Sequence, residues 1–214
     1  CGFCTATCPT YQILGDELRS LGIKDYNSVP TPKIHILTDE IFSKRFPDVQ
    51  NHAFYMATDA DIFINRGRAD TPARMLSTIL HESIHAASTQ KFFSNTEEGS
   101  LSDARVGYRV RSEWKEPSRV HRLEGFNEAM NDYTMYKILL RNQKVIGEEI
   151  DVNGPIYTYL GQYQPLIDRI VEKIAKDRNI SQIEAFNKLE RGQFENSILS
   201  LKEIGYSFGE GSIE

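Results

Sequence analysis

Cysteine is scarce in this chain of 214 residues and is confined to one end. The three cysteines are Cys1, Cys4 and Cys8, and none follows them. Three thiolates are one short of the four that hold a usual iron–sulfur cluster or an all-cysteine structural zinc site. A cysteine-free remainder fits a reducing or an oxidising compartment equally well, so the sequence leaves localisation open between cytoplasmic and secreted.

Long hydrophobic runs and strong net charge are also lacking. The longest apolar stretch is far shorter than the about 20 residues that cross a bilayer, so we expect no integral membrane segment. A net charge of −5 gives no reason to expect nucleic acid or an anionic membrane as a partner. No signal-peptide pattern, internal repeat or low-complexity linker is visible. Oligomeric state stays unknown.

The composition that remains is that of a folded globular protein. Hydrophobic residues make up 40% and aromatic residues 10% of the chain. Short strands are predicted over residues 34–37, 53–57 and 61–65, the last two as a hairpin, with a helix over residues 39–46 capped by Thr38. Beyond residue 140 the pattern is mainly helical, with helices over 165–178, from Ser181 to Gly192, and again after Phe194. We therefore predict the α+β class.

The strongest motif is His81-Glu82-Ser83-Ile84-His85. Apolar spacing predicts a helix over residues 71–88, with Thr71 as its N-cap. Histidines four residues apart project from the same face of a helix, so the two imidazoles can share a metal ion with Glu82 beside it. A metal-bound water next to a carboxylate is the arrangement that hydrolysis at neutral pH requires. The alternative is that both histidines are ordinary residues on a helix surface.

A second constellation lies on a helix predicted over residues 121–140. Glu128 and Asp132 are four residues apart and share a face. A catalytic zinc site takes three protein ligands, and Glu128 can supply the third. Asp132 can then accept the N–H of a ligating histidine and fix its orientation. Taken alone, such a pair is more commonly a solvated acidic face.

Together the two motifs resemble those of the gluzincin metallopeptidases, the thermolysin-like branch of the zincins. The second motif reads Gly125-Phe126-Asn127-Glu128-Ala129-Met130-Asn131-Asp132, which is similar to the family's Gly-x-x-Asn-Glu-x-x-Ser-Asp with one residue fewer and Asn131 in place of serine. The resemblance implies a zincin-like fold, with a small mixed sheet beside the active-site helix. It also implies Zn²⁺ as cofactor and a peptide or protein substrate. The implied roles are zinc ligation by His81, His85 and Glu128, general base for Glu82, and outer support from Asn127 and from Asp132, the partner of a histidine such as His81.

The interval between the two motifs is longer than in thermolysin. Residues 91–103 are polar and predict a loop, whereas residues 105–111 predict a strand or one arm of a hairpin. A peptidase also needs a donor to the oxyanion, for which Tyr108 and His121 are our first candidates and Tyr133 and Tyr136 the others. The strand Ile62–Asn65 is a candidate for binding substrate backbone by strand addition, or else an ordinary core strand.

The amino terminus carries a separate pattern. The run from Cys1 to Tyr11 resembles the latter part of the four-iron four-sulfur motif C-x2-C-x2-C-x3-C-P, with its first cysteine missing. The sequence is similar to that of the iron–sulfur subunits of glycolate oxidase as far as about Glu17. We therefore predict an N-terminal segment over 1–24, followed by one metallopeptidase domain over 25–214. Within that domain we expect a sheet part at 25–70, the helix with the two histidines at 71–88 and an insertion at 89–120. The helix with Glu128 should follow at 121–140, and a helical C-terminal part at 155–205.

Three functions follow as hypotheses. The first is a zinc-dependent peptidase with Glu82 as general base. The second is a zincin-like binding or regulatory module with weak or no turnover, against which the retained Glu82 argues. The third is an iron–sulfur electron-transfer fragment, suggested by residues 1–11 alone.

Overall fold

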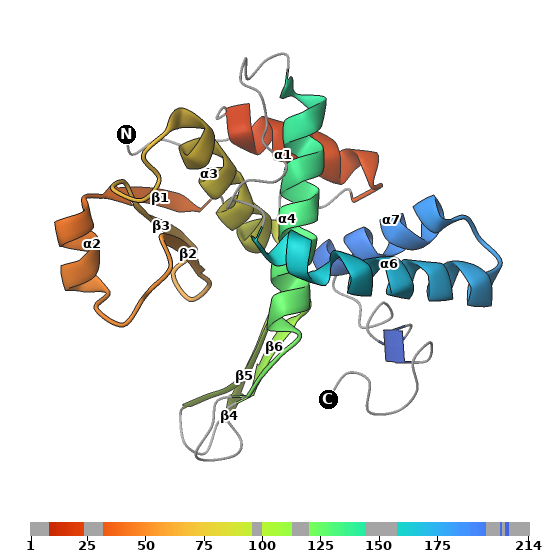
Figure 1. Ribbon diagram of the computed structural model, residues 1–214. Coiled ribbons are helices and arrows are strands. Elements are labelled where there is room, and N and C mark those ends of the chain that lie inside the picture. Colours follow the sequence, from red (N-terminus) through yellow and green to blue (C-terminus); the bar gives the residue numbers. More distant parts are fainter. Residues whose placement is uncertain are drawn as a thin grey trace. The chain divides into compact units, whose positions relative to one another are not determined.

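The computed structural model describes residues 9–23, 32–95, 100–112, 120–143, 158–195, 202 and 204–205 (Figure 1). Helices and two small sheets make the described chain α+β, as predicted. The chain divides into two compact units, one of residues 1–87 and 133–157 and the other of residues 88–132 and 158–214. Helix α4 (Glu124–Arg141) begins in the second unit and ends in the first.

The sheet of the first unit has the strand order β1-β3-β2. Its strands are β1 (Lys33–Leu37), β2 (Ala53–Met56) and β3 (Asp61–Asn65), which confirms the predicted strands and the hairpin. β3 pairs in parallel with β1 and antiparallel with β2. Because both edges of β3 are occupied, the prediction that this strand binds substrate by strand addition is wrong. Its residues Ile62 to Ile64 are instead at most 1% exposed and form core.

Helix α2 (Asp39–Arg45) covers one face of this sheet. The Thr38 hydroxyl accepts a hydrogen bond from the Ile41 amide at 3.4 Å, so the predicted N-cap is confirmed. Four phenylalanines from α2, the residue after it and the sheet meet edge-on or stacked, with ring centroids 4.9–6.1 Å apart: Phe42, Phe46, Phe54 and Phe63. This aromatic cluster fixes α2 on β2 and β3.

Helix α3 (Pro72–Ala87) follows the sheet and begins as predicted, with the Thr71 hydroxyl accepting from the Arg74 amide at 3.2 Å. Its residues Met75 and Ile79 pack on buried residues of the sheet. Helix α1 (Pro9–Ser20) packs against α3 and buries Leu14 and Leu18. The first unit therefore includes α1.

The last turns of α4 are tied to α1 within the first unit. Glu17 of α1 is 4% exposed, and its carboxylate contacts the Lys137 ammonium at 2.7 Å and the Arg141 guanidinium. A buried carboxylate needs its cationic partners, because losing them while it stays buried would leave its charge uncompensated. This ion cluster holds the C-terminal half of α4 on α1.

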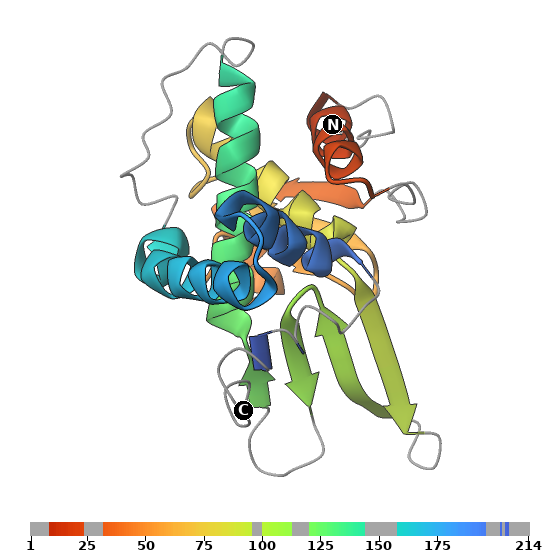
Figure 2. The same ribbon diagram turned by 90° about the vertical axis from the view of Figure 1, so that its right-hand side faces the viewer.

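The second unit contains an antiparallel sheet of β4 (Gln90–Asn95), β5 (Ser100–Val106), β6 (Arg109–Ser112) and β7 (Val120–Arg122), in that order (Figure 2). The loop predicted over residues 91–103 is therefore wrong at 91–95 and 100–103, and residues 96–99 lie outside the described residues. Pairing between β4 and β5 satisfies the backbone there, and strand formation depends more on such pairing than on side-chain polarity. The strand predicted over 105–111 is also interrupted, by a turn at Gly107 and Tyr108.

Helix α4 begins at Glu124, three residues later than predicted, because residues 120–122 form β7 and Leu123 adopts a φ of 56°. Gly125 in its first turn lies directly against Tyr163 of α6 (Thr158–Arg178). A Cβ at position 125 would collide with the end of the Tyr163 side chain, so a larger residue there would require that ring to move. This close approach gives Gly125 a packing role.

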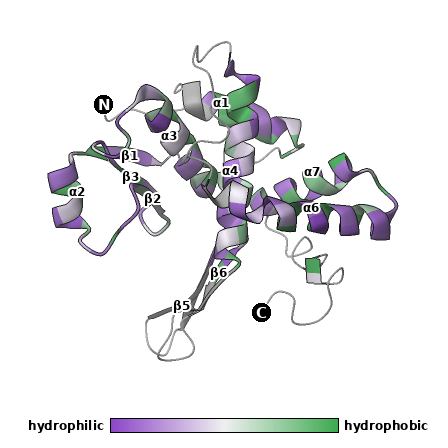
Figure 3. Ribbon diagram, in the orientation of Figure 1, coloured by the Kyte–Doolittle hydropathy of each residue, from purple (hydrophilic) through white to green (hydrophobic). Residues whose placement is uncertain are grey.

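Helices α6 and α7 (Gln182–Phe194) complete the second unit. The capping box of Ser181 and Glu184 is confirmed, whereas Gly192 does not end the helix but lies buried inside it. Both α6 and α7 carry polar as well as apolar residues along their length (Figure 3). The apolar ones form one core with α4, which includes Phe126, Ala129, Met130, Ile167, Ile170, Ile174, Ala185 and Leu189. The further helix expected after Phe194 lies largely outside the described residues. Within the described ranges, no helix has the length and apolar character to cross a membrane.

Candidate metal centre

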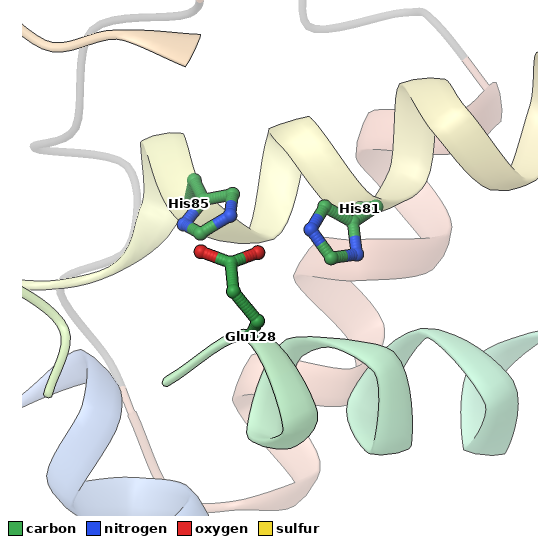
Figure 4. Close-up of side chains that lie close together, drawn as sticks. All are labelled: His81, His85 and Glu128. Atoms are coloured by element: carbon green, nitrogen blue, oxygen red, sulfur yellow. The ribbon is translucent and has the colours of Figure 1, made fainter. Parts of the chain in front are cut away.

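The two histidines of the motif lie on one face of α3, one turn apart (Figure 4). Their ring centroids are 5.0 Å apart, with the ring planes at 69°. His85 is only 6% exposed, and His81 is half-buried. The four-residue spacing on a regular helix produces this arrangement directly, because residues i and i+4 lie on the same face. The prediction that the two side chains share one face of a helix is therefore confirmed, and their role as metal ligands stays a prediction.

Glu128 of α4 completes the group. Among the described residues, His81, His85 and Glu128 form a group of possible metal ligands, with one ligand atom of each within 4.8 Å of the others. Its carboxylate points toward the two imidazoles (Figure 4). Donors about 2.1 Å from one zinc ion stand at most about 4.2 Å apart, so small side-chain rotations suffice for coordination. Two imidazoles and one carboxylate are also a donor set that suits zinc with an open fourth position.

Glu82 and Asp132, the two other acidic residues of the motifs, are both buried. Glu82 follows His81 on α3 and is 7% exposed. Asp132 lies one turn after Glu128 on α4 and is 3% exposed. Carboxylates are rarely buried so deeply without partners, so their burial favours a specific role over a solvated acidic face. The expected pairing of Asp132 with a ligating histidine stays a prediction.

Asn127 has a clear structural role. It is fully buried, and its side-chain oxygen accepts a hydrogen bond from the backbone N–H of Tyr108 at 2.7 Å. The asparagine thus fastens the turn between β5 and β6 to the first turn of α4. This contact supports the start of the helix that carries Glu128, and a role for Asn127 at a metal site stays a prediction.

Tyr108 is not available as an oxyanion donor. Its side chain is 0% exposed, packs edge-on against Phe126 at 5.1 Å between ring centroids, and donates its hydroxyl proton to the Leu189 carbonyl at 2.6 Å. A buried phenol with this partner is a core residue of the second unit, and we withdraw the catalytic assignment. His121 lies in β7 opposite Arg111, and its side chain lies outside the described residues. Tyr133 and Tyr136 are half-buried on α4.

No pattern in the sequence places His52 near the motif. Although it is exposed as a whole, its pKa lies below the ordinary 6.5. The main cause is that neighbouring protein removes water from the ring, and the charges of His81, Arg68 and Arg74 lower the pKa further. An electrostatic effect of His81 on His52 means that the loop before β2 reaches the neighbourhood of a proposed metal ligand.

Comparison with known proteins gives one short match. Over 18 residues the chain is 94% identical to the glycolate oxidase iron–sulfur subunit of Escherichia coli (strain K12), which is 8% of this chain and 4% of that protein's length. No protein-family model matches the chain. No solved structure matches it either. The cysteines of the N-terminal pattern, at positions 1, 4 and 8, lie outside the described residues.

Proposed function

We propose that this chain is a zinc-dependent peptidase of the gluzincin type. The observation that carries the proposal is the convergence of His81, His85 and Glu128 with ligand atoms within 4.8 Å of one another. Two helices separated by more than thirty residues of sequence supply these donors. A chance HExxH pentapeptide would not require a third ligand of the right chemistry at the same place, so the group supports a metal site more strongly than the motif does alone.

The proposed reaction divides the labour among this chain's own residues. Zinc, when bound, supplies a positive charge that polarises the scissile carbonyl and makes a water molecule more acidic. Glu82 accepts the proton of the attacking water and passes it to the nitrogen of the leaving amine. Burial of Glu82 and His85 keeps competing solvent away from the groups that handle this proton.

Activity is tested by Glu82→Gln, which keeps the size and hydrogen-bonding capacity of the side chain but removes its basicity. We expect the wild-type protein, loaded with zinc, to cleave members of a peptide library. The variant should bind zinc equally well and lose about 10²- to 10⁴-fold in rate, the usual contribution of a general base. Equal cleavage by both proteins would contradict the role of Glu82. Zinc binding without cleavage of any peptide would favour the binding or regulatory module instead.

A second candidate comes from the amino terminus. The 18-residue match to an iron–sulfur subunit suggests cluster binding, and the chain has three cysteines where a usual cluster takes four. Anaerobic reconstitution with iron and sulfide, followed by visible spectroscopy, tests this function independently of zinc. A stable cluster chromophore would support it, and its absence in a zinc-binding protein would leave the peptidase proposal as the explanation of the chain.

A further inference from the structure

Gln193, in the last turn of α7, is a fully buried amide with contacts to two distant segments. Its side-chain nitrogen donates a hydrogen bond to the Asn131 side-chain oxygen, and a weaker one to the Ser88 hydroxyl at 3.4 Å. Its backbone carbonyl accepts from the Thr89 amide at 3.0 Å. One residue is therefore bound to α4 on one side and to residues 88–89 on the other.

Both contacted segments adjoin proposed zinc ligands. Ser88 and Thr89 directly follow the last residue of α3, three and four positions after His85. Asn131 follows Glu128 by three positions, which is one turn of α4. Gln193 thus contacts residues that lie within about one helical turn of His85 and of Glu128.

The surroundings of Gln193 are unusually polar for a buried position. Asn127 and Asn131 are 0% exposed, and their side-chain nitrogens have no hydrogen-bond partner among the described residues; the same holds for the side-chain oxygen of Gln193. A well-packed apolar residue at such a place is commonly as stable as a polar network or more so. Stability alone therefore does not explain an amide at position 193, whereas directional contacts that set the placement of two segments do.

We propose that Gln193 is a positioning residue for the metal centre. Gln193 holds residues 88–89, which follow α3, and Asn131, one turn after Glu128 on α4. These contacts fix the spacing of the histidine and glutamate ligands before the ion binds. A ligand set held in place in this way binds its metal more tightly, because less ordering remains to be done on binding. The inference rests on the proposed zinc site and adds to it a residue that touches neither metal nor substrate.

The test uses Gln193→Met, which keeps a long unbranched side chain in the core but removes the amide. Tyr108→Phe is the matched control, because it also deletes a buried hydrogen bond to α7, from the hydroxyl to Leu189, and leaves the backbone bond from residue 108 to Asn127 in place. Zinc affinity is measured by chelator competition on the full chain, after circular dichroism has shown that each variant is folded. We expect about tenfold weaker zinc binding in Gln193→Met, in the range found for outer residues of metal sites, and no more than about twofold in the control.

Cobalt substitution gives a second readout that a general loss of stability would not change. The visible spectrum of bound Co²⁺ reports ligand geometry, so it should differ between Gln193→Met and the wild type and be the same in Tyr108→Phe. Asn131→Ala removes the other end of the hydrogen bond and takes the place of Gln193→Met if that variant does not fold. A folded Gln193 or Asn131 variant with wild-type affinity and spectrum would overturn the positioning role alone. A wild-type protein that binds no zinc would overturn the proposed function as well.

Discussion

Gly107→Ala probes the contact between the β5–β6 turn and the start of α4. Gly107 has a φ of +59°, and a Cβ built on it would lie 2.5 Å from the side-chain oxygen of Asn127. Two further atoms, Cγ of Gln193 and Cβ of Ser88, stand at 3.3 and 3.4 Å. The oxygen of Asn127 would have to move, and it is the acceptor for the buried amide of Tyr108.

The magnitude follows from two effects. An alanine in the left-handed region is less stable than glycine by roughly 1–2 kcal/mol. Displacing the acceptor leaves the Tyr108 N–H unsatisfied in the core, which costs about 1–3 kcal/mol more. We therefore expect Gly107→Ala to lower the free energy of unfolding by about 2–5 kcal/mol. Gly22→Ala is the matched control, since Gly22 has a φ of +79° but nothing within 4 Å of its added Cβ, and only the first effect applies.

The assay is denaturant unfolding of the two variants and the wild type, followed by circular dichroism. A loss in Gly107→Ala no larger than that in Gly22→Ala would refute the reasoning, because it would mean that Asn127 does not hold the turn. Zinc affinity measured on the same samples adds a second comparison. It should fall in Gly107→Ala, whose added methyl group displaces the residue before Glu128, and stay unchanged in Gly22→Ala.

Two further predictions concern the first unit. Glu17→Gln removes the charge that binds Lys137 and Arg141. Because Glu17 is buried while Arg141 is exposed, we expect a loss of about 1–3 kcal/mol in the free energy of unfolding. No loss would mean that this ion cluster does not hold α4. His52 has a pKa below 6.5 in the folded protein, so the native state binds fewer protons than the unfolded state just below that pH. Its contribution to stability is present above pH 6.5 and is lost as the pH falls toward the folded pKa. In metal-free protein, His52→Gln should therefore flatten the plot of unfolding free energy against pH just below pH 6.5. An unchanged slope would contradict the lowered pKa of His52.

Local patterns were predicted well from the sequence. The caps at Thr38 and Ser181, the hairpin of β2 and β3, and the helix that carries His81 and His85 depend on residues a few positions apart, and all are present. The sequence also predicts Glu128 as a ligand, because the metal site that HExxH indicates requires a third donor, and the structure places its carboxylate near the two histidines.

Features that depend on distant residues were missed or misassigned. The hydroxyl of Tyr108 finds its acceptor 81 residues away, and the amide of Gln193 contacts Asn131 across 62 residues. No periodicity encodes such pairs, so the sequence alone suggests a catalytic role for Tyr108 and carries no signal for Gln193. The polar composition of residues 91–103 predicts a loop for the same reason, since the strands at 90–95 and 100–106 exist through pairing between β4 and β5.

The central claim is most directly tested by metal content. Elemental analysis would be made on the wild type, on Glu128→Ala, and on Glu124→Ala, which removes a carboxylate one turn earlier on the same helix and outside the ligand group. We predict about one zinc per chain in the wild type and the Glu124 variant, as a three-ligand site binds, and clearly less in Glu128→Ala. No zinc in any of the three, after purification without chelator and attempted reloading, or equal zinc in all of them, would contradict the metal centre formed by α3 and α4.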